Sequence, residues 1–208
     1  MTDRPRLDAR AFEQLHAKYA DPWHYHTRWY ERRKRALSLA MLTRQRYRRV
    51  FEPGCSIGVL SAALATRCDA LWLQDVSGSA VSRALKALKD QPHVTVTRGA
   101  VPEQWPEGSF DLIVISEMGY YLSHDALETL CERIDGALSD DGELLACHWR
   151  HPIDGSDLDA HGVHAFLGRR LNYTLHGHYE DSDTLMDLWQ RTPSPVASRQ
   201  KGAHDNAS

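Results

Sequence analysis

The stretch Phe51-Glu52-Pro53-Gly54-Cys55-Ser56-Ile57-Gly58, followed by Asp75 at the end of the next apolar run, decides how this chain folds. Gly54-Cys55-Ser56-Ile57-Gly58 satisfies the G-x-S-x-G pattern of a hydrolase nucleophile elbow. An acidic residue followed by two such glycines is also typical of a nucleotide-binding turn between a strand and a helix. The two interpretations predict different chemistry, either acyl-transfer hydrolysis or a reaction that uses a nucleotide cofactor.

From this turn towards the C-terminus, short apolar runs alternate with helical patterns. Strands are predicted at residues 50–51, 70–74, 94–97, 110–115 and 143–148, and helices at residues 59–66, 77–90, 125–138 and 159–168. Ser77 is the predicted N-cap of the helix over 77–90, and Asp140-Asp141-Gly142 is predicted to end the helix over 125–138. The alternation of strands with helices predicts a Rossmann-like, doubly wound α/β fold with a mostly parallel sheet and helices on both faces. Residues 173–179 and 184–189 alternate around Asp181-Ser182-Asp183, which predicts an antiparallel C-terminal strand pair.

The N-terminal part of the chain predicts helices rather than strands. Residues 8–20 have the spacing of an amphipathic helix, which ends where Asp21-Pro22 disfavours further helix. The aromatic segment 23–30 is expected to form a lid helix. Residues 31–42 are expected to form a helix whose inward side chains are Ala36, Leu37, Ala40 and Met41. The predicted organisation is N-terminal helices and a lid in residues 1–45, a cofactor-binding α/β domain in 46–191, and a disordered tail in 192–208.

Composition limits the function classes. The chain of 208 residues has room for one domain, and its net charge of −3 argues against non-specific nucleic-acid binding. Its four scattered cysteines are typical of reduced thiols, and no apolar run approaches the length of a membrane span. We therefore expect a cytoplasmic protein that binds neither nucleic acid nor membrane, with an oligomeric state left open. The arginines between Arg44 and Arg49 are interpreted as a solvated helix end rather than an anion site.

The order of elements separates the two interpretations of the glycine turn. Several strands precede the serine in an α/β-hydrolase, whereas Ser56 follows the first strand here. A triad would formally need Asp111 and His148, but Asp111 starts its strand and so lies at the opposite edge of the sheet from Ser56. The nucleotide interpretation is favoured.

The charge of the turn selects among nucleotide cofactors. A nicotinamide dehydrogenase requires G-x-G-x-x-G, where this turn has Ser56, and Glu52 would repel a pyrophosphate. S-adenosylmethionine (SAM) carries a sulfonium, an ammonium and no phosphate. Asp75 ends the second strand, where a carboxylate can accept both ribose hydroxyls, although it can also be a helix-capping aspartate.

These residues resemble the class I SAM-dependent methyltransferases, whose first, second and fourth motifs correspond to residues 52–58, 73–77 and 109–117. Within that class, residues 21–23, 29–34, 117–122 and 148–152 resemble the nodulation protein S (NodS) group, and the resemblance covers roughly residues 20–190. It implies N-methylation of the free amine of a deacetylated amino sugar, an oligosaccharide or a related small metabolite. The alternatives are an O-methyltransferase for small molecules and a SAM-binding regulatory protein without activity.

The resemblance also implies which residues hold the cofactor. Glu52, Gly54 and Gly58 would line the methionine end, and Asp75 would hold the ribose. Two departures from the family pattern are Ser56, which replaces a glycine, and the segment 98–101, which lacks an aspartate near the adenine. Backbone groups around Ala100 and Val101 are therefore expected to read the adenine. The predicted cofactor-binding residues are Tyr30, Glu52, Gly54, Cys55, Ser56, Gly58, Asp75, Val76, Ala100, Val101 and Ser116.

Candidate catalytic residues follow the fourth and fifth strands, at the edge where ligands bind in such sheets. Glu117 could orient an amine or take its proton, and Tyr120 with Tyr121 could form aromatic walls or simply pack in the core. His148 and His151 are candidate bases, with a hydrogen-bonded strand-end histidine as the structural alternative. No metal site is predicted, because the pairs His161/His164 and His176/His178 have no carboxylate or cysteine at ligand spacing. We expect these four histidines to line a polar pocket or face solvent.

Overall fold

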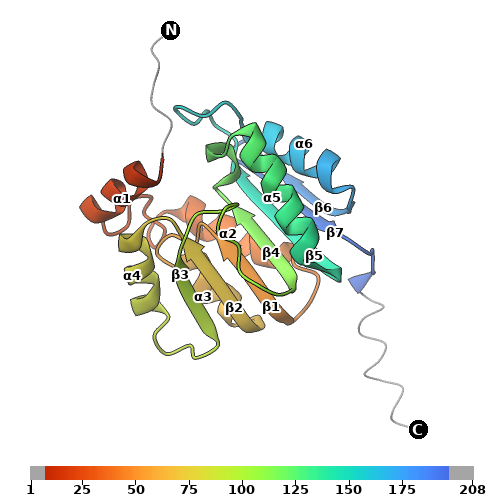
Figure 1. Ribbon diagram of the computed structural model, residues 1–208, viewed down its shortest axis with the longest axis horizontal. Helices are drawn as coiled ribbons and strands as arrows, with labels where there is room; N and C mark the ends of the chain where they lie inside the picture. Colours follow the sequence, from red (N-terminus) through yellow and green to blue (C-terminus); the bar gives the residue numbers. More distant parts are fainter. Residues whose placement is uncertain (1–7, 197–208) are drawn as a thin grey trace.

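A seven-stranded sheet in the order β3-β2-β1-β4-β5-β7-β6 forms the centre of the computed structural model, which describes residues 8–196 (Figure 1). Five strands are parallel: β1 (Tyr47–Pro53), β2 (Cys68–Asp75), β3 (Val94–Arg98), β4 (Phe110–Ser116) and β5 (Leu138–Trp149). Strand β7 (Thr184–Gln190) is antiparallel to both of its neighbours, β5 and β6 (Thr174–Glu180). The predicted fold, including the antiparallel C-terminal pair, is confirmed.

Helices cover both faces of the sheet (Figure 1). Helices α2 (Trp29–Met41), α3 (Val59–Ala65) and α4 (Gly78–Ala87) share a core with one face. Helices α5 (His124–Ala137) and α6 (Ala160–Leu171) share a core with the other face. Helix α1 (Ala9–Lys18) packs against α4, and the short 3₁₀ helix η1 (Gly119–Tyr121) follows β4.

Strand β4 is buried on both faces, which explains its apolar run from Leu112 to Ile115. Leu112 and Val114 belong to the core with α2, α3 and α4, whereas Ile113 and Ile115 belong to the core with α5 and α6. Because successive side chains of a strand point to opposite faces, a strand buried on both faces needs apolar residues at every position. Alternate side chains of β4 therefore pack against the helices on opposite faces of the sheet.

Two predictions about element boundaries are wrong. Helix α5 ends at Ala137 and β5 begins at Leu138, so Asp140-Asp141-Gly142 lies inside the strand instead of separating it from the helix. The extra residues are accommodated by an irregular register, in which Phe110 pairs with Leu138 but Leu112 pairs with Glu143.

The predicted lid helix over residues 23–30 is also wrong, because α2 begins only at Trp29. The carboxylate of Asp21 accepts the backbone N–H groups of Tyr25 and His26 at 2.8 and 3.2 Å. His24 adopts a left-handed backbone with φ of 59°. An Asx-type turn of this kind satisfies the backbone without a helix.

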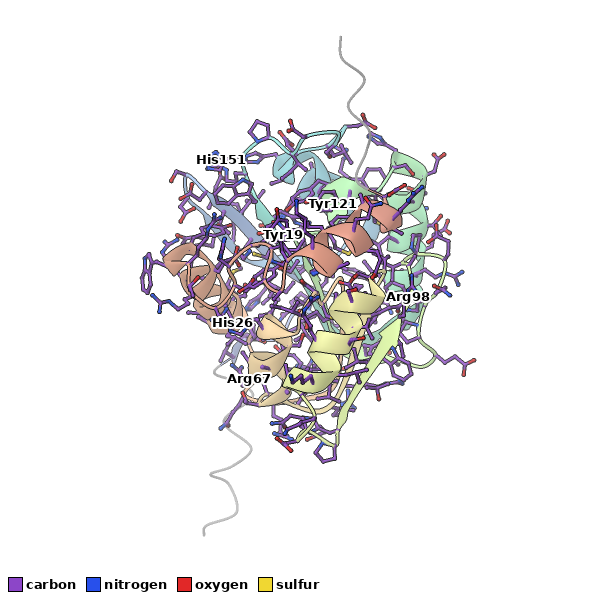
Figure 2. The ribbon with its side chains drawn as sticks, turned by 90° about the vertical axis from the view of Figure 1, so that its left-hand side faces the viewer. Tyr19, His26, Arg67, Arg98, Tyr121 and His151 are labelled. Carbon is purple, nitrogen blue, oxygen red and sulfur yellow. The ribbon has the colours of Figure 1, made fainter. Side chains whose placement is uncertain are left out.

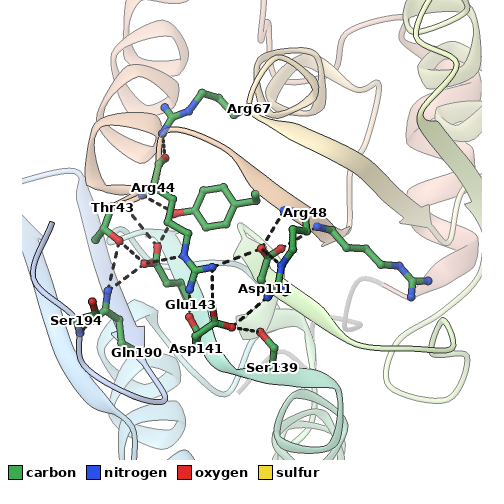
Figure 3. A network of polar contacts seen from close by, with 12 residues as sticks. Thr43, Arg44, Arg48, Arg67, Asp111, Ser139, Asp141, Glu143, Gln190 and Ser194 are labelled. Atoms are coloured by element: carbon green, nitrogen blue, oxygen red, sulfur yellow. Dashed lines mark hydrogen bonds and ion pairs between the residues drawn. The ribbon is translucent and has the colours of Figure 1, made fainter. Parts of the chain in front are cut away.

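A polar network joins β1, β4 and β5 at the end of the sheet opposite the carboxyl ends of the parallel strands (Figure 3). Arg44 pairs with both Asp111 and Asp141, at 3.5 and 3.1 Å, and Arg48 also pairs with Asp111. Glu143 is fully buried and accepts a hydrogen bond from the hydroxyl of Tyr47. The arginines are therefore paired in and beside β1 and do not form a solvated helix end, which corrects that prediction. Asp111 is committed to this edge, as the argument against a hydrolase requires.

Two further observations bear on the predicted organisation. Residues 1–7 and 197–208, which include most of the predicted tail, lie outside the described residues. Within residues 8–196, no helix has the length and apolar character needed to cross a membrane.

Candidate active site

A cavity of about 590 Å³ opens at the carboxyl ends of β1, β2 and β4. Its volume is in the range of sites for small organic ligands. Twelve of the predicted site residues line it: Tyr30, Glu52, Gly54, Cys55, Ser56, Asp75, Val76, Ala100, Val101, Ser116, Glu117 and Tyr120. Three others, Gly58, His148 and His151, are not among its lining residues.

The glycine turn between β1 and α3 has an unusual backbone. Gly54, Ser56 and Gly58 have φ values of 70°, 50° and 83°, all in the left-handed region. A Cβ atom on Gly58 would lie 3.3 Å from the Cα atom of Ala84, so glycine permits the close contact between α3 and α4. Ser56, the departure from the family pattern, is held in its strained conformation because its N–H donates to Asp75 Oδ2 at 2.8 Å.

Asp75 links the glycine turn to the next helix. Its Oδ1 accepts the N–H of Ser77 at 2.9 Å, while its Oδ2 accepts that of Ser56. The cap of α4 is Ser77, as predicted, because its hydroxyl accepts the N–H of Ala80. Burial raises the pKa of Asp75, although both backbone hydrogen bonds lower it. Each carboxylate oxygen keeps a second lone pair, so Asp75 can still accept ligand hydroxyls.

Glu52 is a polar side chain of the cavity whose hydrogen bonding is incomplete. It is 3% exposed, and its Oε2 has no hydrogen-bond partner within residues 8–196. Burial raises the pKa of Glu52 to about 8; the Ser61 hydroxyl acts against this shift and Asp75 adds to it. A buried carboxylate without a partner is costly, and a cationic ligand group would remove that cost. The residues present therefore fit a ligand that carries an ammonium, as S-adenosylmethionine does.

At the predicted adenine end, one backbone N–H group is already bonded within the protein. The N–H of Ala100 donates to Gln104 Oε1 at 2.9 Å, so this backbone group already has an acceptor. Gln74 Nε2 donates to the carbonyl of Gln104 at 2.8 Å, which holds the loop after β3 against the end of β2. Ala100 and Val101 both line the cavity, and the reading of the adenine by backbone groups around them stays a prediction.

Helix α1 covers the glycine turn and brings residues that the sequence did not reveal. His16 is buried, with Nε2 3.4 Å from the Ser56 hydroxyl and its ring against Trp23. Glu13 accepts hydrogen bonds from the hydroxyls of Ser77 and Ser79 at the start of α4. In Figure 2, Tyr121 lies beside α1, where its ring meets Phe12 edge-on at 4.9 Å.

Helix α2 presents a polar face to the cavity. We call the part of the cavity lined by Glu31, Lys34, Glu117 and Trp149 the acceptor half, and the part lined by Glu52, the glycine turn and Asp75 the cofactor half. Glu31, Lys34 and Ser38 are the buried residues of α2, whereas Ala36 and Ala40 are exposed, so the predicted inward face is wrong at those two positions; Met41 packs against the core as predicted. Lys34 Nζ lies 2.7 Å from Glu117 Oε1 and 3.0 Å from Glu31 Oε2. Burial lowers the pKa of Lys34, but the carboxylates of Glu117 and Glu31 outweigh it, and the pKa is raised. The sequence signal for this buried polar face is the spacing of Glu31, Lys34 and Ser38, which places all three on one side of the helix.

Glu117 is fixed by donors from three separate elements. Its Oε2 accepts the N–H of Trp149 at 2.9 Å and the hydroxyl of Tyr120, while its Oε1 faces Lys34. Glu117 itself has a left-handed backbone, with φ of 55°. The rings of Tyr30 and Trp149 meet edge-on at 4.6 Å, so aromatic walls adjoin the carboxylate. Tyr120 is buried in the core and also lines the cavity with its neighbour Tyr121, which combines the two alternatives for this pair.

The two predicted bases lie outside the cavity, which contradicts their assignment. His148 is fully buried: its Nε2 accepts the N–H of Gly119 at 3.1 Å, and its Nδ1 lies 2.9 Å from His164 Nε2. Burial lowers the pKa of His148 well below its usual range, with His164 and Lys34 adding to the shift. His151 lies at the outer surface, 2.8 Å from Asp183 Oδ1 (Figure 2). His148 is thus the hydrogen-bonded strand-end histidine of the alternative interpretation.

The remaining histidines do not share one environment. His164 is buried in a hydrogen-bonded chain, which corrects its predicted place in a pocket or in solvent. His161 and His178 are half-exposed beside Glu180. Within residues 8–196, no cluster of three or more histidine, cysteine, aspartate or glutamate side chains could hold a metal ion.

Comparison with known proteins places this site in context. Residues 8–170 match the family "Nodulation protein S (NodS)". Nodulation protein S of Sinorhizobium fredii is 27% identical over 185 residues, which cover 87% of this chain and 77% of that protein. A crystal structure described as a putative methyltransferase from Pseudomonas syringae is 51% identical, with a TM-score of 0.71, over 79% of this chain and all of that one.

A second solved structure shares the fold at lower identity. The N-methyltransferase NodS of Bradyrhizobium japonicum, crystallised with S-adenosyl-L-homocysteine, has a TM-score of 0.80 and 23% identity over 89% of this chain and 98% of that one. The methyltransferase fold predicted from the sequence is confirmed.

Proposed function

Since this chain belongs to the nodulation protein S (NodS) family of SAM-dependent methyltransferases, we propose that it methylates the free amine of a deacetylated amino sugar, an oligosaccharide or a related small metabolite. The proposal concerns the acceptor, namely its amine and its sugar. The family of the relatives supports them, and so does the charge of the acceptor half.

The observation that carries the proposal is an excess of carboxylates next to the cavity. Glu31 and Glu117 share the single ammonium of Lys34. Burial raises the pKa of Glu31, Lys34 lowers it, the charge of Glu117 raises it further, and Arg35 lowers it. A second cation in the acceptor half would relieve this excess of negative charge. A substrate amine that arrives as an ammonium supplies that cation.

Each group of residues then has a proposed task. Glu52 would hold the ammonium of the cofactor, Asp75 its ribose, and the turn from Gly54 to Gly58 its methionine end. When bound, SAM supplies a methyl group on a positively charged sulfur. Glu117, fixed by Lys34, Tyr120 and Trp149, would orient the amine, and the rings of Tyr30 and Trp149 would exclude water around it. Such positioning contributes roughly 7–11 kcal/mol in well-oriented reactions.

The position of the histidines favours an amine over a hydroxyl acceptor. An alcohol needs a base to remove its proton; His148 and His151 do not line the cavity, and His16, which does, lies at the Ser56 hydroxyl in the cofactor half. An amine that binds as an ammonium must lose one proton before it can attack; partial desolvation lowers its pKa against the opposing effect of the nearby carboxylates, and Glu117 would accept that proton. The proton of the methylated product can then leave to solvent.

The test is a mass-spectrometric screen for a gain of one CH2 unit. Glucosamine oligosaccharides with one free amine are compared with the same sugars fully N-acetylated, with SAM in excess. We expect the gain on the free amines alone, at a rate that rises with pH as the amine deprotonates. A gain on the acetylated sugars would indicate O-methylation. Binding of SAM without methylation of any acceptor would favour a regulatory protein.

A further inference from the structure

A chain of buried hydrogen bonds runs from the acceptor half to strand β7. The N–H of Gly119 donates to His148 Nε2 at 3.1 Å, and His148 Nδ1 lies 2.9 Å from His164 Nε2. His164 Nδ1 lies 2.7 Å from Asp187 Oδ2, and His178 Nδ1 lies 2.7 Å from Asp187 Oδ1. His148, His164 and Asp187 are all buried, and none of them lines the cavity.

The Gly119 N–H at one end and the Asp187 carboxylate at the other together fix the protons of the two buried rings. The Gly119 N–H can only donate, so His148 Nε2 must accept and the proton of its neutral ring is on Nδ1. His148 Nδ1 then donates to His164 Nε2, which leaves the His164 proton on Nδ1, facing Asp187. The carboxylate of Asp187 accepts from His164 at one oxygen and from His178 at the other. Each donor has one acceptor, so the tautomers of both buried rings are set.

The Gly119 end of the chain supports the segment that carries the acceptor residues. Gly119 is two positions after Glu117, which has the left-handed backbone, and directly precedes Tyr120. A Cβ atom on Gly119 would lie 2.9 Å from His148 Nε2 and 2.5 Å from Val163 Cγ1, so the backbone is packed directly on the ring. Tyr120 also meets the His148 ring edge-on at 5.2 Å.

We infer that His164 and Asp187 are positioning residues, which keep the proton of His148 on Nδ1 and so hold the segment from Glu117 to Tyr120 in place. Without them, His148 is free to carry its proton on Nε2. That N–H would face the N–H of Gly119, and two donors in contact repel each other. The hydrogen bond that holds the segment would then be lost. Only the kinetic consequence of this role rests on the proposed methylation; the proton arrangement does not.

The proton arrangement is tested first, by NMR on the full-length protein with ¹⁵N-labelled histidine. We expect both His148 and His164 to show a protonated Nδ1 and a bare Nε2. A proton on His148 Nε2 would overturn the inference, whatever the enzyme methylates.

The positioning role is tested with two substitutions at one site. His164→Leu removes the acceptor for His148 Nδ1–H, whereas the side-chain oxygen of His164→Gln can replace Nε2 as that acceptor. Exchange of the Gly119 amide with solvent should accelerate on the order of tenfold or more in His164→Leu, and stay near the wild-type rate in His164→Gln. The matched control is His176→Asn, at an exposed histidine of the neighbouring strand β6.

The same variants separate positioning from a general loss of structure. With a glucosamine oligosaccharide as the probe acceptor, turnover should fall on the order of 10- to 100-fold in His164→Leu. It should be largely restored in His164→Gln. The Kd for SAM should change less than twofold in both, because His148, His164 and Asp187 do not line the cavity.

The amide-exchange and turnover measurements can each refute the positioning role. Wild-type amide exchange at Gly119 in His164→Leu would refute the positioning role. An equal loss of turnover in both His164 variants would do the same. If the wild type methylates none of the amines, the proposed acceptor is wrong, and the NMR and exchange measurements still decide the inference.

Discussion

The two halves of the cavity hold their charges in opposite ways. In the cofactor half, Glu52 is buried with an oxygen that has no hydrogen-bond partner in the described part of the chain, and Asp75 is bonded to backbone N–H groups. In the acceptor half, Glu31 and Glu117 are already paired with Lys34. The cofactor half therefore depends on a cation that the ligand brings, whereas the acceptor half contains a cation of its own.

The halves also differ in how far apart their residues lie in the sequence. The glycine turn and Asp75 come from one β-α-β unit, residues 47–75. The acceptor half combines Lys34 of α2, Glu117 after β4 and Trp149 at the end of β5. The first half can be tested with substitutions in one segment. The second needs substitutions that break contacts between distant segments.

The largest effect is expected for Lys34→Met, which leaves the buried Glu31 and the part-buried Glu117 without their shared cation. Removing one partner of a buried ion pair typically costs about 3–5 kcal/mol. The free energy of unfolding, measured by urea denaturation at pH 8 without ligand, should fall by about that amount. The loss should be smaller at pH 5, where Glu31, whose pKa is raised, can take up a proton instead.

Arg33→Met is the matched control for that substitution. Arg33 is on the same helix and pairs with Asp181, but its side chain is 39% exposed. Exposed pairs contribute about 0–1 kcal/mol, so its effect should be within that range. Equal losses for the two variants would show that the acceptor half does not depend on a buried cation.

Glu52→Gln should produce the next largest effect, on cofactor affinity. At pH 8 the Kd for SAM should weaken by about 1.5–3 kcal/mol, the contribution of a hydrogen bond to a charged group. In the wild type, Glu52 must lose its proton to pair with an ammonium, and its pKa is about 8. Affinity should therefore rise with pH, by up to ~10-fold per unit below pH 8, and level off above it. Isothermal titration calorimetry in buffers of different ionisation enthalpy measures both the slope and the proton release.

Without ligand, the contribution of Glu52 to folding stability depends on pH in the opposite direction, because it falls as the pH rises. The folded-state pKa of Glu52 is raised from 4.5 to about 8, so the folded protein holds a proton that the unfolded chain has released. This contribution to stability is present below pH 4.5 and is lost as pH rises towards 8. Glu52→Gln should remove that part of the pH dependence while it weakens cofactor binding. A wild-type pH slope of SAM affinity in the variant would assign the slope to another group.

The sequence was sufficient where one short segment contains both the pattern and its function. The order of strands and helices, the cap at Ser77 and the position of the glycine turn follow from local periodicity and turn chemistry. The lid helix over 23–30 failed for a local reason, because Asp21 bonds to the backbone of Tyr25 and His26 and makes a turn instead.

Sequence patterns could not reveal contacts that form only between distant segments. The buried face of α2 is polar, which makes sense only once Glu117 is placed beside Lys34. His148 was correctly placed near the carboxyl edge, but successive side chains of a strand point to opposite faces. The cavity receives Trp149, and His148 turns towards His164 of α6.

Asp75→Asn should have a smaller effect on the cofactor half. An amide has one acceptor oxygen, so one of the two N–H groups of Ser56 and Ser77 would be left without a partner. A buried unsatisfied donor costs about 1–3 kcal/mol, and partial solvation should keep the loss of unfolding free energy near the lower limit. Thermal unfolding monitored by circular dichroism, with and without SAM, measures it. An unchanged melting temperature would mean that the turn does not need both hydrogen bonds.

The smallest effect is expected for Glu13→Gln, which tests whether α1 belongs energetically to the cofactor half. Glu13 accepts hydrogen bonds from the hydroxyls of Ser77 and Ser79, and an amide oxygen can keep part of that contact. Because the site is partly open to solvent, the loss should be about 0.5 kcal/mol, or roughly two- to threefold in the Kd for SAM.

The pH dependence distinguishes Glu13 from Glu52. Hydrogen bonds from Ser79 and Ser77 lower the pKa of Glu13 to about 2, against an ordinary value of 4.5. Its contribution is present above pH 4.5 and is lost only as pH falls towards 2. Glu13→Gln should therefore shift the affinity curve between pH 6 and 9 without changing its slope, whereas Glu52→Gln should flatten it. A changed slope in Glu13→Gln would mean that α1 alters the ionisation of Glu52, and that the cofactor half extends into the N-terminal helix.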